Sequence, residues 1–162
     1  MSLFERVRAA LIALAPPEAE PTGDGEELRV AATALMVRTV DADGRVLPEE
    51  RAALERALAE TYALDDAGVA ALIERGTRAD RGATDLYEHT SVLRRRTAPE
   101  ERAALVGVLY ELAFADDELH EGEDATVTRI SDLLGVDARD RVLARKEAAD
   151  RRGLPVLPTT GD

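Results

Sequence analysis

The sequence has no cysteine and only two histidines, His89 and His120. Without cysteine the chain cannot form a disulfide, a thiolate metal site or a cysteine nucleophile, and two histidines leave a zinc site short of ligands. Aromatic residues make up only 3% of the chain, although 45% of it is hydrophobic. The core must therefore consist mainly of Leu, Val, Ile and Ala, a mixture that favours closely packed helices.

Long apolar runs are also missing. No stretch approaches the ~20 apolar residues that a membrane-spanning helix needs. The first residues place the charged Glu5, Arg6 and Arg8 among apolar positions, a pattern unlike that of a secretory signal. We therefore expect a cytoplasmic protein without a transmembrane segment.

Positive charge is scarce relative to negative charge. Lys and Arg number 21 against 33 Asp and Glu, which gives a formal net charge of -12. Such a chain repels phosphate backbones and anionic membranes at long range. The composition predicts no nucleic-acid partner and favours cations or the basic surfaces of other proteins.

The length of 162 residues fits one domain with one proper core. Helical spacing of apolar residues predicts an all-α fold, a compact bundle of about seven helices. We expect an amphipathic helix over residues 1–15, a linker over 16–25, the helical domain over 26–150 and a flexible tail over 151–162. The first helix carries an apolar stripe that packs on the core or contacts a membrane surface or a partner helix; the stripe consists of Leu3, Phe4, Val7, Leu11 and Leu14.

Several residues predict helix boundaries. Pro48 suits the first turn of a helix, because its missing N–H has no partner there. Asp65 begins a shorter helix that Gly76 is placed to end. Thr97 is expected to cap the next long helix, with Glu100 reaching back to it.

The chain contains an internal repeat. A shift of 73 positions superposes two segments that each read as an apolar helix, an acidic turn, one inward apolar residue and a second helix opening with glutamates. We therefore predict two related helix-loop-helix units that bury their apolar faces against each other. The matched pairs are Ala32 with Leu105, Leu35 with Val108, Met36 with Leu109, Asp43 with Asp116, Val46 with Leu119, and Glu50 with Glu123.

The acidic turns predict a cation site. In the frame of an EF-hand loop, Asp41 and Asp43 take the third and fifth positions and Glu50 takes the bidentate last position, but Thr39 replaces the first aspartate. The second turn departs further, with Asp117 where the frame expects glycine. The pattern therefore argues against a standard pair of EF-hands.

Three interpretations of these turns stay open. One is a reduced site that uses Asp41, Asp43 and Glu50. Another is a shared site that adds Asp116 and Glu123 from the second turn, with Ca²⁺ or Mg²⁺ favoured because both prefer oxygen ligands. The third is a set of solvated helix ends, since acidic residues interact favourably with a helix N-terminus without any ion.

The segment Asp43-Gly44-Arg45-Val46-Leu47-Pro48-Glu49-Glu50, echoed over residues 115–123, resembles the paired signature of the TerB-like family. This family includes tellurite-resistance TerB proteins and the N-terminal region of DjlA-type co-chaperones, and the resemblance covers about residues 26–146. It implies an all-helical bundle, a role in metal or stress responses, and a metal-binding acidic surface. By position, that surface would comprise Asp43, Glu50, Asp116 and Glu123. No His-Pro-Asp triplet occurs, so a co-chaperone activity is not expected.

The first functional hypothesis is a non-enzymatic binding module that couples cation occupancy or cell stress to a protein partner. Asp116 and Glu123 have carboxyl groups suited to acid/base catalysis, but spacing alone supplies no pocket and no substrate-positioning group. His120 is expected to be a surface loop residue and His89 a partly buried helical one. The alternative is a structural or scaffolding helical domain that binds proteins without a metal.

Overall fold

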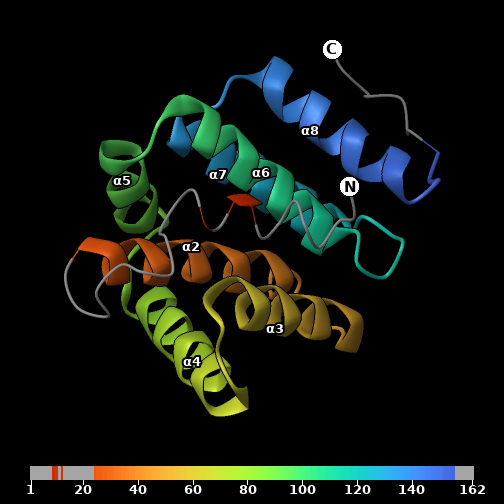
Figure 1. Ribbon diagram of the computed structural model, residues 1–162. Coiled ribbons are helices and arrows are strands. Elements are labelled where there is room, and N and C mark those ends of the chain that lie inside the picture. The colour runs from red at the N-terminus through yellow and green to blue at the C-terminus, as the bar shows by residue number, and fades with distance from the viewer. Residues whose placement is uncertain (1–8, 11, 13–23, 156–162) are drawn as a thin grey trace.

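A computed structural model describes residues 9, 10, 12 and 24–155, and within residues 24–155 it contains seven helices and no strand (Figure 1). The all-α fold class is therefore confirmed. Most of the predicted helix over 1–15, most of the linker over 16–25 and the end of the tail lie outside the described residues. The helices are α2 (Asp24–Val40), α3 (Pro48–Tyr62), α4 (Asp66–Gly82), α5 (Tyr87–Arg96), α6 (Pro99–Ala113), α7 (Glu121–Leu134) and α8 (Ala138–Arg151).

The helices form two groups. Helices α2, α3 and α4 lie together, helices α6, α7 and α8 form the second group, and α5 connects the groups at one end (Figure 1). Helix α2 is central, because it packs against α4, α5, α6 and α7 as well as α3. Within the second group, α6 contacts both α7 and α8. The acidic segments that follow α2 and α6 therefore start from neighbouring helices.

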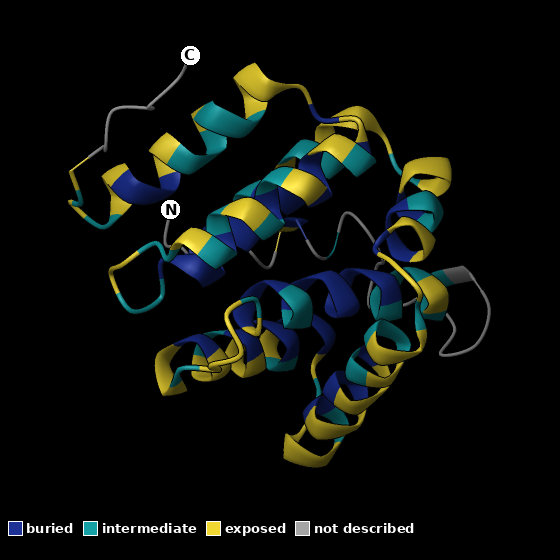
Figure 2. Cartoon of the chain, turned by 180° about the vertical axis from the view of Figure 1, so that it is seen from behind, coloured by how far each residue is buried: buried dark blue, intermediate teal, exposed yellow. Residues whose placement is uncertain are grey.

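The core is aliphatic, as the composition predicts. Buried residues face the inside of the bundle and exposed residues face outward (Figure 2). Burial of a leucine side chain contributes ~1.5–3 kcal/mol to folding before entropy is counted, so such a core can stabilise a domain of this size. The largest fully buried side chains are Tyr110, Leu35, Met36, Leu54, Leu58, Leu72, Leu93, Leu105, Leu109, Ile130 and Leu134.

Two residues that the sequence predicts at helix ends have other roles in the structure. Gly76 does not end its helix, because α4 continues to Gly82. A Cβ on Gly76 would lie 2.7 Å from Cγ2 of Thr33 in α2, so the missing side chain allows two helices to approach closely. Thr97 does not cap α6: its hydroxyl donates back to the carbonyl of Leu93.

Other boundaries follow the sequence signals. The N-cap of α6 is Ala98, whose N–H donates to Glu101 Oε2 at 3.0 Å, so the acidic residue that reaches back is Glu101 and not Glu100. Helix α3 begins at Pro48, as predicted. Asp65 Oδ1 accepts a 2.8 Å hydrogen bond from the N–H of Gly68 and so caps α4.

In the described part of the chain, no helix combines the length and the apolar content that crossing a membrane requires.

Candidate metal centre

Two acidic loops have the same local structure. Loop 1 comprises residues 41–47, between α2 and α3, and loop 2 comprises residues 114–120, between α6 and α7. In loop 1, Asp43 Oδ1 accepts a hydrogen bond of 3.1 Å from the backbone N–H two residues later. In loop 2, Asp116 Oδ1 accepts the equivalent bond at 3.2 Å. Each aspartate therefore stabilises its own turn with one carboxylate oxygen.

The backbone conformation also matches at the residue after each aspartate. Gly44 has φ of +76° and Asp117 has φ of +65°, so both are left-handed. Aspartate tolerates this conformation better than most residues with a side chain. Asp117 also accepts a 2.7 Å hydrogen bond from Nη1 of Arg152 at the end of α8. The lack of glycine in loop 2 therefore does not change the local turn.

The apolar residues of the two loops differ. Leu119 is partly buried and packs against the core, but Val46 is 43% exposed. The prediction that Val46 points inward is therefore wrong. The end of α8 lies against loop 2 through Arg152 and Asp117, whereas loop 1 has no comparable ion pair among the described residues. The two loops are alike, but duplication of the complete helical units stays a prediction.

Two glutamates are buried where the helices that follow these loops begin. Glu50 is the third residue of α3 and Glu123 is the third residue of α7, and each is 1% exposed. Oε2 of Glu50 and both carboxylate oxygens of Glu123 are buried and have no hydrogen-bond partner. Buried polar atoms without partners are rare, and a buried carboxylate is costly unless a cation, a proton or a donor compensates it. These oxygens are therefore suited to bind a positively charged group.

His120 completes the group. It is the N-cap residue of α7, and its Nε2 lies 3.0 Å from Asp116 Oδ2 and 3.9 Å from Glu123 Oε1. The side chain is 33% exposed, so one side of the imidazole faces solvent. The sequence predicts a surface loop position for His120, but its spacing of four residues from Asp116 and three from Glu123 is a signal that indicates contact with both.

The structure brings four of the five predicted ligands together. Two sets of three residues can each place their ligand atoms within 4.8 Å of one another, and His120 belongs to both. A Cβ on Gly122 would lie 3.6 Å from the Cβ of Asp43, so loop 1 passes directly against the first turn of α7. The sets are Asp43, His120 and Glu123, and Glu50, Asp116 and His120; these five residues are called the donor cluster below.

The fifth predicted ligand, Asp41, lies apart from the donor cluster. It is exposed and belongs to neither set of three residues. Its backbone carbonyl accepts a 3.0 Å hydrogen bond from the N–H of Gly44, which helps to close loop 1. The geometry therefore matches the shared arrangement across both loops rather than a site within loop 1 alone.

The electrostatics of the cluster reflect the crowding of like charges. Burial and, after it, the nearby carboxylates of Asp116 and Asp43 together raise the pKa of Glu50 to about 7. Burial also raises the pKa of Glu123 to about 8, with a second contribution from Glu50. The hydrogen bond to Asp116 raises the pKa of His120. Near neutral pH the cluster therefore holds protons that a cation would displace.

Four carboxylates and one imidazole make a mixed oxygen and nitrogen donor set. Carboxylates suit Mg²⁺, Ca²⁺ and Mn²⁺, whereas imidazole suits first-row transition ions such as Fe²⁺ and Zn²⁺. The partnerless oxygens of Glu50 and Glu123 fit a divalent ion, because among the described residues neither carboxyl group forms an ion pair with a Lys or Arg. The residues of the donor cluster are therefore suitable ligands for a divalent cation.

The seven helices within residues 24–155, with paired acidic loops that converge on buried carboxylates, define a class of small helical domain. A fold of this kind does not by itself establish an activity. The family model for "Tellurite resistance protein TerB" matches residues 29–146. The chain therefore belongs to the TerB family, as the paired acidic signature indicated. No curated protein and no solved structure matches the chain.

Proposed function

We propose that this TerB-family chain is a non-enzymatic, divalent-cation-responsive binding module whose ion is held by the donor cluster. The single observation that carries the proposal is the burial of Glu50 and Glu123, with carboxylate oxygens that have no partner, at the point where loop 1 meets α7. An ion there would neutralise both carboxylates and link the two loops.

The donor set favours a first-row transition ion over Ca²⁺ or Mg²⁺. An imidazole nitrogen is a good ligand for Fe²⁺ or Zn²⁺ and a poor one for the alkaline-earth ions, and carboxylates beside it also suit Mn²⁺. His120 Nε2 lies 3.0 Å from Asp116 Oδ2, so one imidazole nitrogen and one carboxylate oxygen are adjacent, as two ligands of a single ion would be. The ligands therefore favour Mn²⁺, Fe²⁺ or Zn²⁺, in contrast to the Ca²⁺ or Mg²⁺ that the sequence pattern favours.

The cluster supports binding rather than catalysis. Five of the larger surface hollows among the described residues are lined by residues outside the donor cluster. An enzyme needs a cavity that places a substrate next to its acid, base or metal. A buried ion between two loops would instead stabilise one conformation of the bundle, and a protein partner would recognise that conformation.

The test is a thermal melt of protein stripped with a chelator, with and without Mn²⁺, Zn²⁺, Ca²⁺ or Mg²⁺. An ion at about 100 times its dissociation constant should raise Tm by roughly 5–10 °C in a domain of this size. Glu50→Gln combined with Glu123→Gln should remove that rise, because the amides cannot supply the two negative charges. Asp43→Asn combined with Asp116→Asn should have the same effect.

Asp41→Asn is the matched control, because Asp41 is an acidic residue of loop 1 outside both ligand sets. It should keep the full response to the ion. If no ion raised Tm in the parent protein, or if the Glu50 and Glu123 double variant responded fully, the cation site would be rejected. The alternative function, a helical interaction domain without a metal, would then be favoured.

A further inference from the structure

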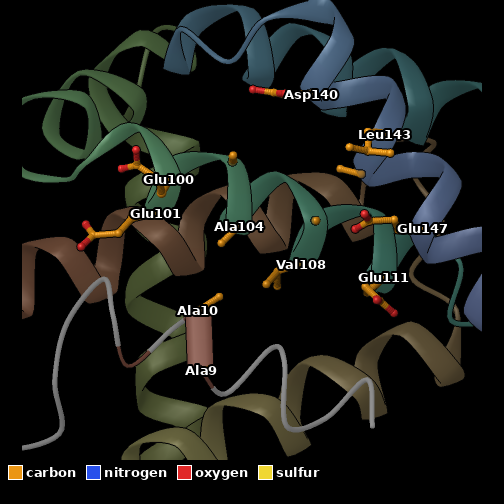
Figure 3. Close-up of a pocket in the computed structure, with 13 residues that line it drawn as sticks. Ala9, Ala10, Glu100, Glu101, Ala104, Val108, Glu111, Asp140, Leu143 and Glu147 are labelled. Atoms are coloured by element: carbon orange, nitrogen blue, oxygen red, sulfur yellow. The ribbon is translucent and has the colours of Figure 1, made fainter. Parts of the chain in front are cut away.

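A second feature of the molecule, away from the donor cluster, is a groove of about 660 Å³ along the outer side of α6. Helix α8 forms one wall, with Asp140, Leu143 and Glu147, and Ala9 and Ala10 line the opposite wall (Figure 3). The lining residues of α6 run from Glu100 to Glu111, roughly 17 Å along the helix, which matches about three turns of a bound helix. The groove has the length of a helix-docking surface.

The floor of the groove is apolar and made of small residues. Ala103, Ala104 and Gly107 of α6 and Ala144 of α8 line it, and a Cβ on Gly107 would have no atom within 4 Å. Leu143, which borders this floor, is 50% exposed and is one of three large exposed hydrophobic residues in the described chain. Small residues let a helix backbone approach closely, and Leu143 supplies an apolar anchor for it.

Every charged residue among the described residues that line the groove is acidic. Glu100 and Glu101 lie at one end and Glu111 and Glu147 lie at the other (Figure 3). Arg151 pairs with Glu111 and lies 3.5 Å from Glu147, which partly neutralises that second end.

No described basic residue neutralises the groove at the end formed by Glu100 and Glu101 or at Asp140 on the α8 wall. Within residues 24–155, Glu100, Glu101 and Asp140 take part in no ion pair. Glu101 does cap α6, but its charge remains. An occupant of the groove must therefore be apolar along one side and positively charged beside it.

The geometry points to a basic amphipathic helix of a partner protein as the ligand of this groove. Its apolar stripe would lie on Ala104, Gly107 and Leu143, and its Lys or Arg residues would pair with Glu100, Glu101 and Asp140. The groove offers no side-chain hydrogen-bond donor among its described lining residues, so it suits neither an anion nor a polar metabolite. This inference is independent of the cation site.

The experiment measures binding of a fluorescein-labelled 15-residue helical peptide to the full chain in the presence of a chelator. The peptide carries Leu at helical spacing and Lys and Arg elsewhere, and a second peptide replaces every Lys and Arg with Glu. Fluorescence anisotropy should show saturable binding of the basic peptide and at least ~10-fold weaker binding of the acidic one.

Glycine variants distinguish the groove from general attraction to an acidic protein. Gly107→Leu fills the groove and should weaken binding at least ~10-fold. Gly82→Leu is the matched control, because Gly82 also has open space around an added Cβ but lies at the end of α4. It should leave binding unchanged. Asp140→Lys and the exposed control Glu60→Lys test charge in the same way and do not require a larger residue on α6.

Equal binding by the parent and the Gly107→Leu variant would overturn the proposal, as would absence of binding. A further variant replaces Leu3, Phe4 and Val7 with Ser. If the parent failed to bind the basic peptide and this variant bound it, the groove would be occupied by the N-terminal segment of the chain itself. That result would also overturn the assignment to a partner helix.

Discussion

Glu50 and Glu123 hold the same position in two helices: each is the third residue of its helix, each is 1% exposed, and each follows an acidic loop of the same local structure. A helix N-terminus stabilises a carboxylate through its free N–H groups. Burial and neighbouring carboxylates act against this effect, and they dominate, because both pKa values are raised. In the metal-free protein, ionisation of these two glutamates is therefore unfavourable at neutral pH.

The first prediction concerns the pH dependence of the metal-free protein. The folded pKa values of about 7 for Glu50 and about 8 for Glu123 exceed the ordinary value of 4.5, so the folded state binds more protons than the unfolded state. Their contribution to stability is complete below about pH 4.5 and is lost as pH rises through about 8. We expect a combined loss of roughly 3–5 kcal/mol between about pH 5.5 and 8.5.

Chemical denaturation of the chelated protein across this range measures the effect. The double variant Glu50→Gln and Glu123→Gln should have a flatter profile, and at about pH 8.5 it should be more stable than the parent. Titration of the other carboxylates contributes to both proteins, so the difference between the two profiles isolates the pair. Identical profiles would show that these glutamates do not titrate in this range.

The second prediction concerns cation affinity. An ion must displace the protons of Glu50, Glu123 and His120, so affinity should rise as pH increases from about 6 to about 8, by at least ~10-fold. Isothermal titration calorimetry in buffers of different ionisation enthalpy would report both the dissociation constant and the number of protons released. Binding that released no proton at about pH 6.5 would contradict the raised pKa values.

The third prediction concerns the selectivity that the imidazole confers. His120→Ala removes the one nitrogen donor of the cluster and should lower the affinity for Zn²⁺ or Mn²⁺ by ~10–100-fold. His89→Ala is the control for loss of a histidine, since His89 lies on α5 outside both ligand sets. An ion series measured by thermal melt would show whether only His120→Ala changes the order of preference. An unchanged order would leave the cluster as an all-oxygen site.

The fourth prediction compares two helical glycines. Gly76→Ala would place a Cβ 2.7 Å from Thr33 Cγ2 and 3.2 Å from the backbone nitrogen of Ala34, so it should destabilise the fold by ~1–3 kcal/mol. Gly107→Ala has open space and should stabilise α6 by ~0.5–1 kcal/mol. Urea denaturation of the two variants provides the measurement. Opposite signs are expected, and stabilisation by both changes would contradict the close contact of α4 with α2.

Sequence patterns predicted the helices and most of the cluster, since apolar spacing and turn residues act locally. The shift of 73 positions paired Asp43 with Asp116 and Glu50 with Glu123, and the structure places all four together. The pattern could not show that the two glutamates are buried, because burial depends on how loop 1 packs on α7. It also missed His120, whose role depends on contacts with both loops.

The remaining errors have the same origin in tertiary structure. Gly76 looked like a helix end because glycine has a low helix propensity, but the close contact with Thr33 requires it within α4. Val46 looked like a core residue because its counterpart Leu119 is one. Only loop 2 has α8 beside it, and no local pattern in loop 1 could reveal that difference.

The spacing of the cluster along the chain has a final consequence. Glu50 and Glu123 are 73 residues apart, so an ion that binds both would act as a reversible crosslink closing a long segment of the chain. Crosslinks over long segments restrict the unfolded state strongly, and an ion that binds only the folded state stabilises both ends of the segment together. Metal supply would then determine whether α3 and α7 open independently or unfold as one unit.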